Sequence, residues 1–296
     1  MTGAMLHYDE LGLNAMDTGA PGTWMCEGTH VSMRELADLL HIECLEEPWL
    51  ARSVFTLRRV RNGESLLRCG DKFGSLYVVR SGCFKIVLTD FSGSEHVLGF
   101  PMRGDMMGAD GIGNRHYCST AIALESSEVV IVPFASPARL ADECPELAAS
   151  LYGVISRELV HAQNMTWALG TLNSESRVAA FLVSFSARLG AMGYSRRSFI
   201  LRMTRREIGN YLGLKLETVS RALSALHSSG IIRVNQRNID IVDSDALHGV
   251  IDTASLGAAR GVARNARFAR AFDIRRATLS RKKVTQDRQR GAFMPA

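Results

Sequence analysis

Residues Met203 to Val242 carry signals for two short helices, a tight turn between them and a small β-hairpin after them. Thr204, followed three residues later by Glu207, matches a capping box, in which each side chain bonds a free backbone N–H of the first helical turn. Gly213 predicts the turn, and we expect the second helix from Leu216 to Ser228. This order of elements is the outline of a winged helix-turn-helix, a DNA-reading unit.

The second of these helices has an apolar face at helical spacing and a polar face opposite it. The polar side chains that could enter a major groove together are Glu217, Ser220, Arg221 and Ser224. A carboxylate can accept from cytosine, an arginine can bond guanine through two hydrogen bonds, and a hydroxyl serves either way. We therefore predict a DNA-binding site made of Glu217, Thr218, Ser220, Arg221 and Thr204.

The composition is that of an ordinary folded protein, with 46% hydrophobic and 22% charged residues in a chain of 296. The N-terminal residues lack the basic start and apolar core of a secretory signal, and no apolar run has the length of a membrane span. We expect a cytoplasmic protein without a membrane partner. Its six cysteines lack a paired C-x-x-C spacing and are expected to be free thiols.

Basic residues are concentrated near the C-terminus. The segment Arg260 to Arg290 contains eleven Lys or Arg and only two acidic residues, so the rest of the chain is slightly acidic. Few large apolar residues occur there, and we expect residues 247–296 to form a disordered tail. Such a tail could add DNA affinity that depends on salt and not on sequence, or it could simply aid solubility.

Between residues 53 and 132 short apolar runs alternate with glycine turns, which predicts a β-barrel or jelly roll. The order G-E-x-L-x-x-x-G-D, L-Y-V-V-R-S-G, F-K-I, D-F-S-G-S-E and G-D-M-M-G resembles the β-roll of cyclic-nucleotide-binding domains. With a DNA-reading segment behind it, the chain resembles the Crp/Fnr family of transcription regulators. The resemblance implies an α+β fold with five parts: an N-terminal extension (1–48), a β-roll (49–135), a dimerisation helix (136–171), a winged helix-turn-helix (172–246) and the tail.

The reading helix narrows the resemblance to the Fnr branch, whose members carry Glu, Ser and Arg in the spacing E-x-x-S-R. By this resemblance Glu217 and Arg221 would read a G·C pair and Ser220 a neighbouring T, within a TTGAT-N4-ATCAA-like palindrome.

A helical pattern starts near residue 138 and links the two parts. Its apolar stripe consists of Leu151, Ile155, Leu159, Ala162, Met165 and Leu169. The stripe continues for about six turns, longer than a small barrel needs, and helix-turn-helix readers act as two-fold dimers. We therefore predict that this stripe pairs with its copy in a homodimer.

The ligand position of the β-roll departs from the family members that bind cyclic nucleotides. The resemblance implies a Glu just after G-x-x-x-G and an Arg shortly beyond it, but Ala109 and Cys118 stand there. Asp110 and Arg115 could replace them only in a rebuilt loop, so we expect no binding of cyclic AMP.

Fnr proteins hold an iron-sulfur cluster through closely spaced N-terminal cysteines and one barrel cysteine, since a cluster requires several thiolates at one site. This chain has only Cys26 and Cys44 before the barrel, and Val130 at the barrel position. We expect no cluster of the usual kind.

Three interpretations of the signal stay open, and with them the cofactor. A haem would need an axial ligand such as His96, His116 or Met106. A redox response would use an exposed thiol, for which Cys26 and Cys118 are the candidates. DNA binding controlled only by the protein's own expression, as in FixK-like relatives, would need no sensor site.

Two other functions compete with regulation. A nucleic-acid-binding protein driven by its basic tail would bind all sequences alike. An enzyme of the cupin type would need clustered His and Glu ligands, whereas Glu95, His96 and His116 lack the usual H-x-H pair. The sequence favours a homodimeric regulator and not an enzyme, with double-stranded DNA as partner. An activator would also contact RNA polymerase, through the loop from Asp90 to His96.

Overall fold

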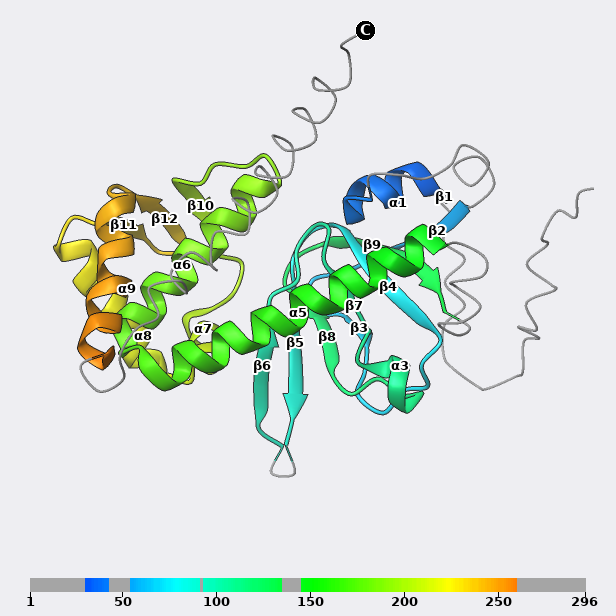
Figure 1. Cartoon of the computed structure of the whole chain (residues 1–296), viewed down its shortest axis with the longest axis horizontal. Helices are drawn as coiled ribbons and strands as arrows, with labels where there is room; N and C mark the ends of the chain where they lie inside the picture. The colour runs from blue at the N-terminus through cyan, green and yellow to red at the C-terminus, as the bar shows by residue number, and fades with distance from the viewer. Residues whose placement is uncertain (1–29, 43–53, 91–92, 135–144, 260–296) are drawn as a thin grey trace, which may run out of the picture.

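The computed structural model describes residues 30–42, 54–90, 93–134 and 145–259. They form two lobes joined by one long helix, as Figure 1 shows. The first lobe is a β-roll, and the second combines helices with a small sheet. The α+β fold expected from the sequence is confirmed.

The β-roll consists of two antiparallel sheets, with strand orders β1-β2-β9-β4-β7 and β3-β8-β5-β6. The strands are β1 (His30–Ser32), β2 (Val54–Val60), β3 (Ser65–Leu67), β4 (Ser75–Ser81), β5 (Phe84–Thr89), β6 (Glu95–Gly99), β7 (Met106–Met107), β8 (Thr120–Ala123) and β9 (Ser127–Pro133). Alternate side chains of both sheets, among them Phe84, Met107 and Val129, meet in a shared core. Two short helices, α1 (Met33–Leu40) and α3 (Gly111–Asn114), complete the lobe.

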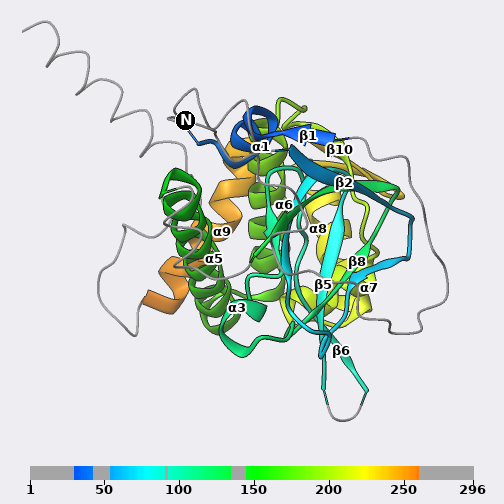
Figure 2. The ribbon, with the colours of Figure 1, turned by 90° about the vertical axis from the view of Figure 1, so that its right-hand side faces the viewer.

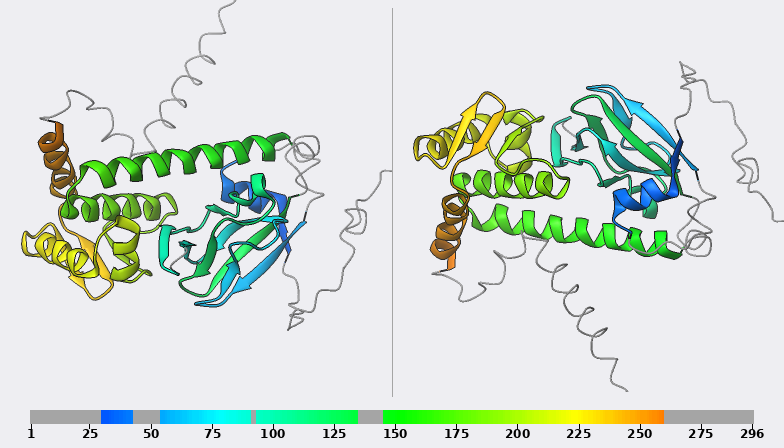
Figure 3. Two further views of the ribbon diagram at one scale, coloured as in Figure 1. Left: turned by 90° about the horizontal axis from the view of Figure 1, so that it is seen from below. Right: turned by 90° about the horizontal axis from the view of Figure 1, so that it is seen from above.

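The long helix α5 (Pro145–Thr171) runs beside both lobes, and Figure 3 shows it against the roll at one end and the helical lobe at the other. Figure 2 looks from the β-roll end and places α5 to one side of the strands. Two residues of the predicted dimer stripe face inward instead. Leu151 is buried against the roll with Val154, and Met165 packs on the core of the second lobe.

Leu151 and Met165 therefore help the helix to cover its own protomer, and their part in a dimer contact stays a prediction. The remaining members of the stripe, Ile155, Leu159, Ala162 and Leu169, are exposed. Tyr152 is also exposed and continues the same line, three residues before Ile155.

The second lobe follows directly after α5. Its elements are α6 (Ser174–Ala191), β10 (Ser198–Ile200), α7 (Arg205–Leu212), α8 (Leu216–Ser228), β11 (Ile232–Asn235), β12 (Asn238–Ile241) and α9 (Ser244–Ala259). The predicted reading helix is confirmed at its expected bounds, and the hairpin β11–β12 turns at Gln236 and Arg237. Neither α6 nor β10 is expected from the sequence.

The prediction that a disordered tail starts at residue 247 is wrong. Residues 247–259 belong to α9, and Leu247 and Ile251 are buried in the core of the second lobe. This helix packs along α6, where the backbone carbonyl of Val250 accepts a hydrogen bond from Ser176 at 2.8 Å. The remainder of that segment, 260–296, lies outside the described residues.

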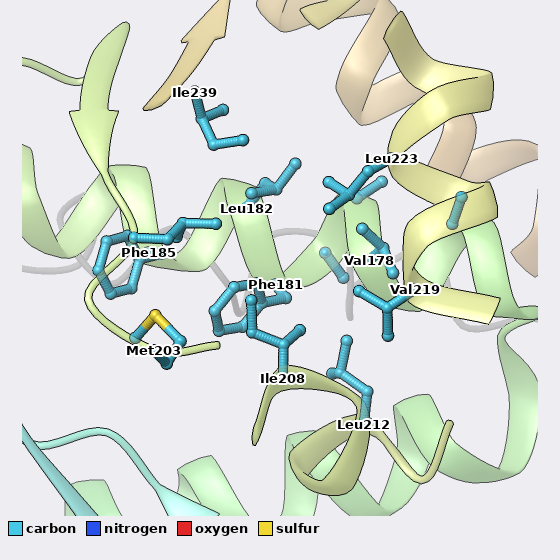
Figure 4. Packing of buried hydrophobic residues seen from close by; sticks show 14 of the residues in the cluster. Val178, Phe181, Leu182, Phe185, Met203, Ile208, Leu212, Val219, Leu223 and Ile239 are labelled. Carbon is cyan, nitrogen blue, oxygen red and sulfur yellow. The ribbon is translucent and has the colours of Figure 1, made fainter. Parts of the chain in front are cut away.

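Buried side chains from α6, α7 and α8 interdigitate to hold the helix-turn-helix together (Figure 4). The two helices approach closely at Gly209, where the turn brings the Leu214 carbonyl back toward α7. The Leu214 N–H donates to the Gly209 carbonyl at 2.7 Å, and a side chain at 209 would put its Cβ only 2.6 Å from the Leu214 oxygen. Glycine is therefore required there for the two helices to cross at this angle.

The two lobes share one hydrophobic core. Phe100, which follows β6, packs on Tyr211 of α7 and Phe181 of α6, with ring centroids 5.2 and 6.1 Å apart. Tyr211 also bonds His161 of α5 at 2.8 Å, so three elements meet around this ring. Burial raises the pKa of Tyr211 to about 12 and lowers the pKa of His161.

Polar contacts reinforce the same junction. The Asn210 side chain accepts from the Val97 N–H at 2.6 Å and donates to the Glu95 carbonyl at 2.5 Å. It therefore pairs with the free edge of β6 as a neighbouring strand would. Lys85 of β5 contacts Glu207 of α7 at 3.0 Å, and both side chains are largely covered.

We expect Gly209→Ala to lower the free energy of unfolding by about 1–3 kcal/mol or more, because α7 and α8 must separate to accept the methyl group. Gly249→Ala in α9 is the matched control. No atom lies within 4 Å of its added Cβ, so helix propensity should make that variant more stable by about 0.5–1 kcal/mol. Urea unfolding measures both changes, and equal effects would contradict this account of the crossing.

We expect the Lys85–Glu207 contact to stabilise the chain at neutral pH and not in acid. Burial raises the pKa of Glu207, but the Thr204 backbone N–H and the Lys85 ammonium outweigh it and hold the pKa below its ordinary value of 4.5. A carboxylate with a lowered pKa stabilises the fold above that value, and the stabilisation disappears as the pH falls through the lowered pKa.

Lys85→Met should therefore lower the free energy of unfolding by about 1–3 kcal/mol at pH 7, and the deficit should shrink as the pH falls below 4.5. Lys72→Met replaces an exposed lysine of the same lobe and serves as the control. Urea titrations between neutral and acidic pH measure the difference. A deficit that does not vary with pH would contradict the assigned contact.

Candidate nucleic-acid interface

The first helix of the helix-turn-helix, α7, begins with the capping box that the sequence predicts. The Thr204 Oγ1 accepts from the Glu207 N–H at 3.2 Å, and the Glu207 carboxylate accepts from the Thr204 N–H at 2.7 Å. The side chain of Thr204 is therefore occupied at the helix start, although the residue itself is exposed. Its role in DNA binding stays a prediction.

The outer face of α8 presents the predicted reading residues to solvent. Glu217, Arg221 and Ser224 are exposed, whereas Ser220 and Thr218 are half-buried. The opposite face is buried through Val219, Ala222, Leu223 and Leu226. Glu217, Ser220 and Arg221 lie three and four residues apart on one side of the helix, so the structure brings these three side chains together.

Positive charge surrounds this face. Lys215 occupies the N-cap position of α8, and Arg206 of α7 and Arg233 and Arg237 of the hairpin are exposed. A helix N-terminus already attracts anions through its free N–H groups. The surface around α8 can therefore hold a phosphate backbone while the polar face meets base edges.

Arg205 is a member of this surface that the sequence analysis does not identify. Its guanidinium Nη1 donates to the Ser220 Oγ at 3.3 Å, across the turn between the two helices. The two residues are fifteen positions apart and on different helices, so no local pattern indicates the contact. Only the crossing of α7 and α8 reveals it.

Of the two cysteines proposed as redox-sensitive, the structure describes only Cys118. Cys26 lies outside the described residues. Cys118 is half-buried, and its single thiol proton can be donated to the backbone carbonyl of Asp110, 3.4 Å away, or to that of His116, 3.7 Å away. Cys83 is buried, and burial raises its pKa to about 12, so it stays protonated at neutral pH.

In the loop after β7, where the resemblance places a cyclic-nucleotide site, residues of the loop contact one another and the core. Ala109 packs against the core beneath α1. The Asp110 carboxylate accepts from the buried Ser119 hydroxyl at 2.6 Å. Arg115 ends α3 in a left-handed conformation, with φ of 59°. The Asp110 carboxylate is thus already bonded within the loop as it is folded.

The three residues considered as haem ligands lie in separate places. Met106 is buried in the roll, His96 bonds Asp90 at 3.2 Å on the exposed β5–β6 hairpin, and His116 bonds the Asn114 carbonyl beside α3. Among the described residues, no group of three or more His, Cys, Asp or Glu gathers in a way that could hold a metal ion. Within the same ranges, every helix is too short or too polar to cross a membrane.

Each lobe matches a known protein family domain. Residues 176–250 match the Crp-like helix-turn-helix domain, and residues 57–143 match the cyclic nucleotide-binding domain. The transcriptional regulatory protein btr of Bordetella pertussis is 40% identical over 197 residues, which are 67% of this chain and 81% of that protein. The fumarate and nitrate reduction regulatory protein of Escherichia coli K12 is 40% identical over 188 residues, or 64% of this chain and 75% of that protein.

Among solved structures, FixK2 from Bradyrhizobium japonicum superposes with a TM-score of 0.61 at 30% identity, covering 67% of this chain and 98% of FixK2. The chain covers 81% and 75% of the two regulators, and the two matched family domains lie in the β-roll and in the second lobe. The chain therefore belongs to the Crp/Fnr family of DNA-binding transcription regulators.

Proposed function

We propose that the chain is a homodimeric activator that reads a TTGAT-N4-ATCAA-like palindrome in the cytoplasm. The observation that carries this proposal is the group of Glu217, Ser220 and Arg221 on one side of α8, in which Glu217 and Arg221 are exposed and Ser220 is half-buried. Arg221 and Glu217 together match a G·C pair, since arginine bonds guanine and a carboxylate accepts from cytosine. The E-x-x-S-R spacing is the one that the resemblance to the Fnr branch attaches to this operator.

The exposed line on α5 supports the dimer. Tyr152, Ile155, Leu159, Ala162 and Leu169 follow one another at intervals of three, four or seven residues, which is the heptad spacing of a coiled-coil seam. Leu159 leaves 59% of its surface exposed in the single protomer, and a partner helix would cover it. A two-fold pair of readers matches the two halves of a palindrome.

The β5–β6 hairpin supports the activator role. Leu88 and Leu98 are 41% and 51% exposed there, beside the polar residues Asp90 and His96. Exposed apolar side chains with a polar rim suit a protein partner, and RNA polymerase is the partner in this proposal. The similarity to a regulator named for fumarate and nitrate reduction extends the proposal to a response to redox state, oxygen or nitric oxide.

Arg221→Ala should abolish the preference for the palindrome over a scrambled duplex of equal length. Each half-site loses a bidentate contact with about 1–3 kcal/mol of discrimination, so the preference should fall more than about tenfold. Glu217→Ala should act in the same direction. Gel-shift titrations at fixed salt concentration measure the ratio of dissociation constants.

Arg206→Ala removes an exposed arginine outside α8 and is the control, expected to weaken both duplexes alike. A chain truncated after Ala259 tests the basic tail. If the truncation abolishes binding while the two α8 variants behave as wild type, the tail drives non-specific binding and the proposal is wrong.

Leu159→Asp should convert the dimer into a monomer. A dimer would cover the 59% of this leucine that is exposed, once in each protomer, about 2–4 kcal/mol in total, so the dimer dissociation constant should rise about a hundredfold. Val160→Asp alters an exposed apolar neighbour one position off the seam and should leave the dimer intact. Sedimentation velocity measures both, and an unaltered Leu159→Asp dimer would contradict the seam.

A further inference from the structure

Ser220 is the only residue of the reading trio that another helix holds in place. The Arg205 Nη1 lies 3.3 Å from the Ser220 Oγ, and both residues are half-buried where α7 crosses α8. Glu217 and Arg221 on either side of it are exposed. The orientation of the serine is therefore set before any ligand arrives, while its two neighbours are free to adjust.

The chemistry of the pair fixes which partner gives the proton. A guanidinium has donors only, whereas a hydroxyl has one donor and two acceptor lone pairs. The Ser220 oxygen must therefore accept from Arg205. Its own proton remains available, because within the described residues the hydroxyl makes no other hydrogen bond.

Some hydroxyls on helices of this chain donate that proton to a backbone carbonyl instead. Thr166 and Thr171 donate to the carbonyls four residues earlier, at 2.9 and 2.8 Å. Ser220 makes no such bond to its own helix, and Arg205 holds its oxygen toward α7. What sets Ser220 apart is therefore the fixed position of its oxygen.

A hydroxyl with its oxygen engaged and its proton free reads a base edge as a donor. It matches the acceptors of the major groove, such as thymine O4 or guanine O6, whereas only one lone pair is left to accept from the amino group of cytosine. The nearby positive charge of Arg205 favours the same acceptors.

We propose that Arg205 is a positioning residue that biases Ser220 toward donating a hydrogen bond, so that a base with an acceptor is preferred opposite Ser220. This inference rests on the proposed reading of DNA by α8. A thymine at that position accepts the hydrogen bond, whereas a cytosine would have to donate to the one lone pair that Arg205 leaves open. Arg205 would contribute to specificity without touching a base.

The test measures dissociation constants for the palindrome and for a version in which the T·A pair facing Ser220 is replaced by C·G in both halves. Wild type should prefer T over C by about tenfold. Arg205→Met keeps the apolar stem and removes the donors, so this preference should fall to within about twofold, while discrimination at the G·C pair persists. Arg206→Met is the matched control and should keep both preferences.

A double variant separates positioning from an independent contact. Arg205→Met combined with Ser220→Ala should lose no more discrimination than Ser220→Ala alone, because both act through the same hydroxyl. Arg205→Lys keeps the charge without the planar fork and should lose part of the preference. If a thermal melt shows that Arg205→Met does not fold, the preference of Arg205→Lys for T over C serves as the test instead.

A simple phosphate contact gives the opposite pattern. Arg205→Met would then weaken every duplex by one factor, reduce the salt dependence and keep the preference for T, while Arg205→Lys would resemble wild type. That result overturns the inference, and so does a preference unchanged in both variants. Failure of the proposed function looks different, since Arg221→Ala would then retain full discrimination at the G·C pair.

Discussion

The close crossing of α7 and α8 at Gly209 is the constraint on which the rest of the reader depends. With no side chain at 209, the turn can bring the Leu214 carbonyl against α7. The apolar side of α8 then packs on α6 and α7, which leaves Glu217 and Arg221 facing outward. The same crossing places Arg205 next to Ser220. A single backbone approach therefore determines both the direction of the reading face and its internal contact.

The first helix of the reader is also bound to the β-roll. Asn210 pairs with the edge of β6, Glu207 contacts Lys85, and Tyr211 packs on Phe100. Thus α7 supports the reading helix on one side and contacts the β-roll on the other. A shift of β5 or β6 would act on the start of α7 directly, since Glu207 also caps that helix.

Local signals predicted a large part of this arrangement. The capping box, the span of α8 and the hairpin follow from neighbouring residues, because caps, helical spacing and turns depend on short stretches of chain. The inward orientation of Leu151 and Met165 could not be predicted, since a helical stripe does not say which neighbour covers it. The contacts of Arg205 and Asn210 also depend on how distant segments meet. Burial of Leu247 in α9 was missed for the same reason.

The central claim is that the outer face of α8 enters the major groove in two symmetric half-sites. Protection of guanine N7 from methylation on the palindrome tests it most directly, because this atom lies in the major groove beside the contact assigned to Arg221. The account predicts protected guanines in both halves, about one helical turn apart, and loss of that protection in Arg221→Ala. Guanines that remain reactive with the wild-type protein bound, or equal protection by the variant, would contradict it.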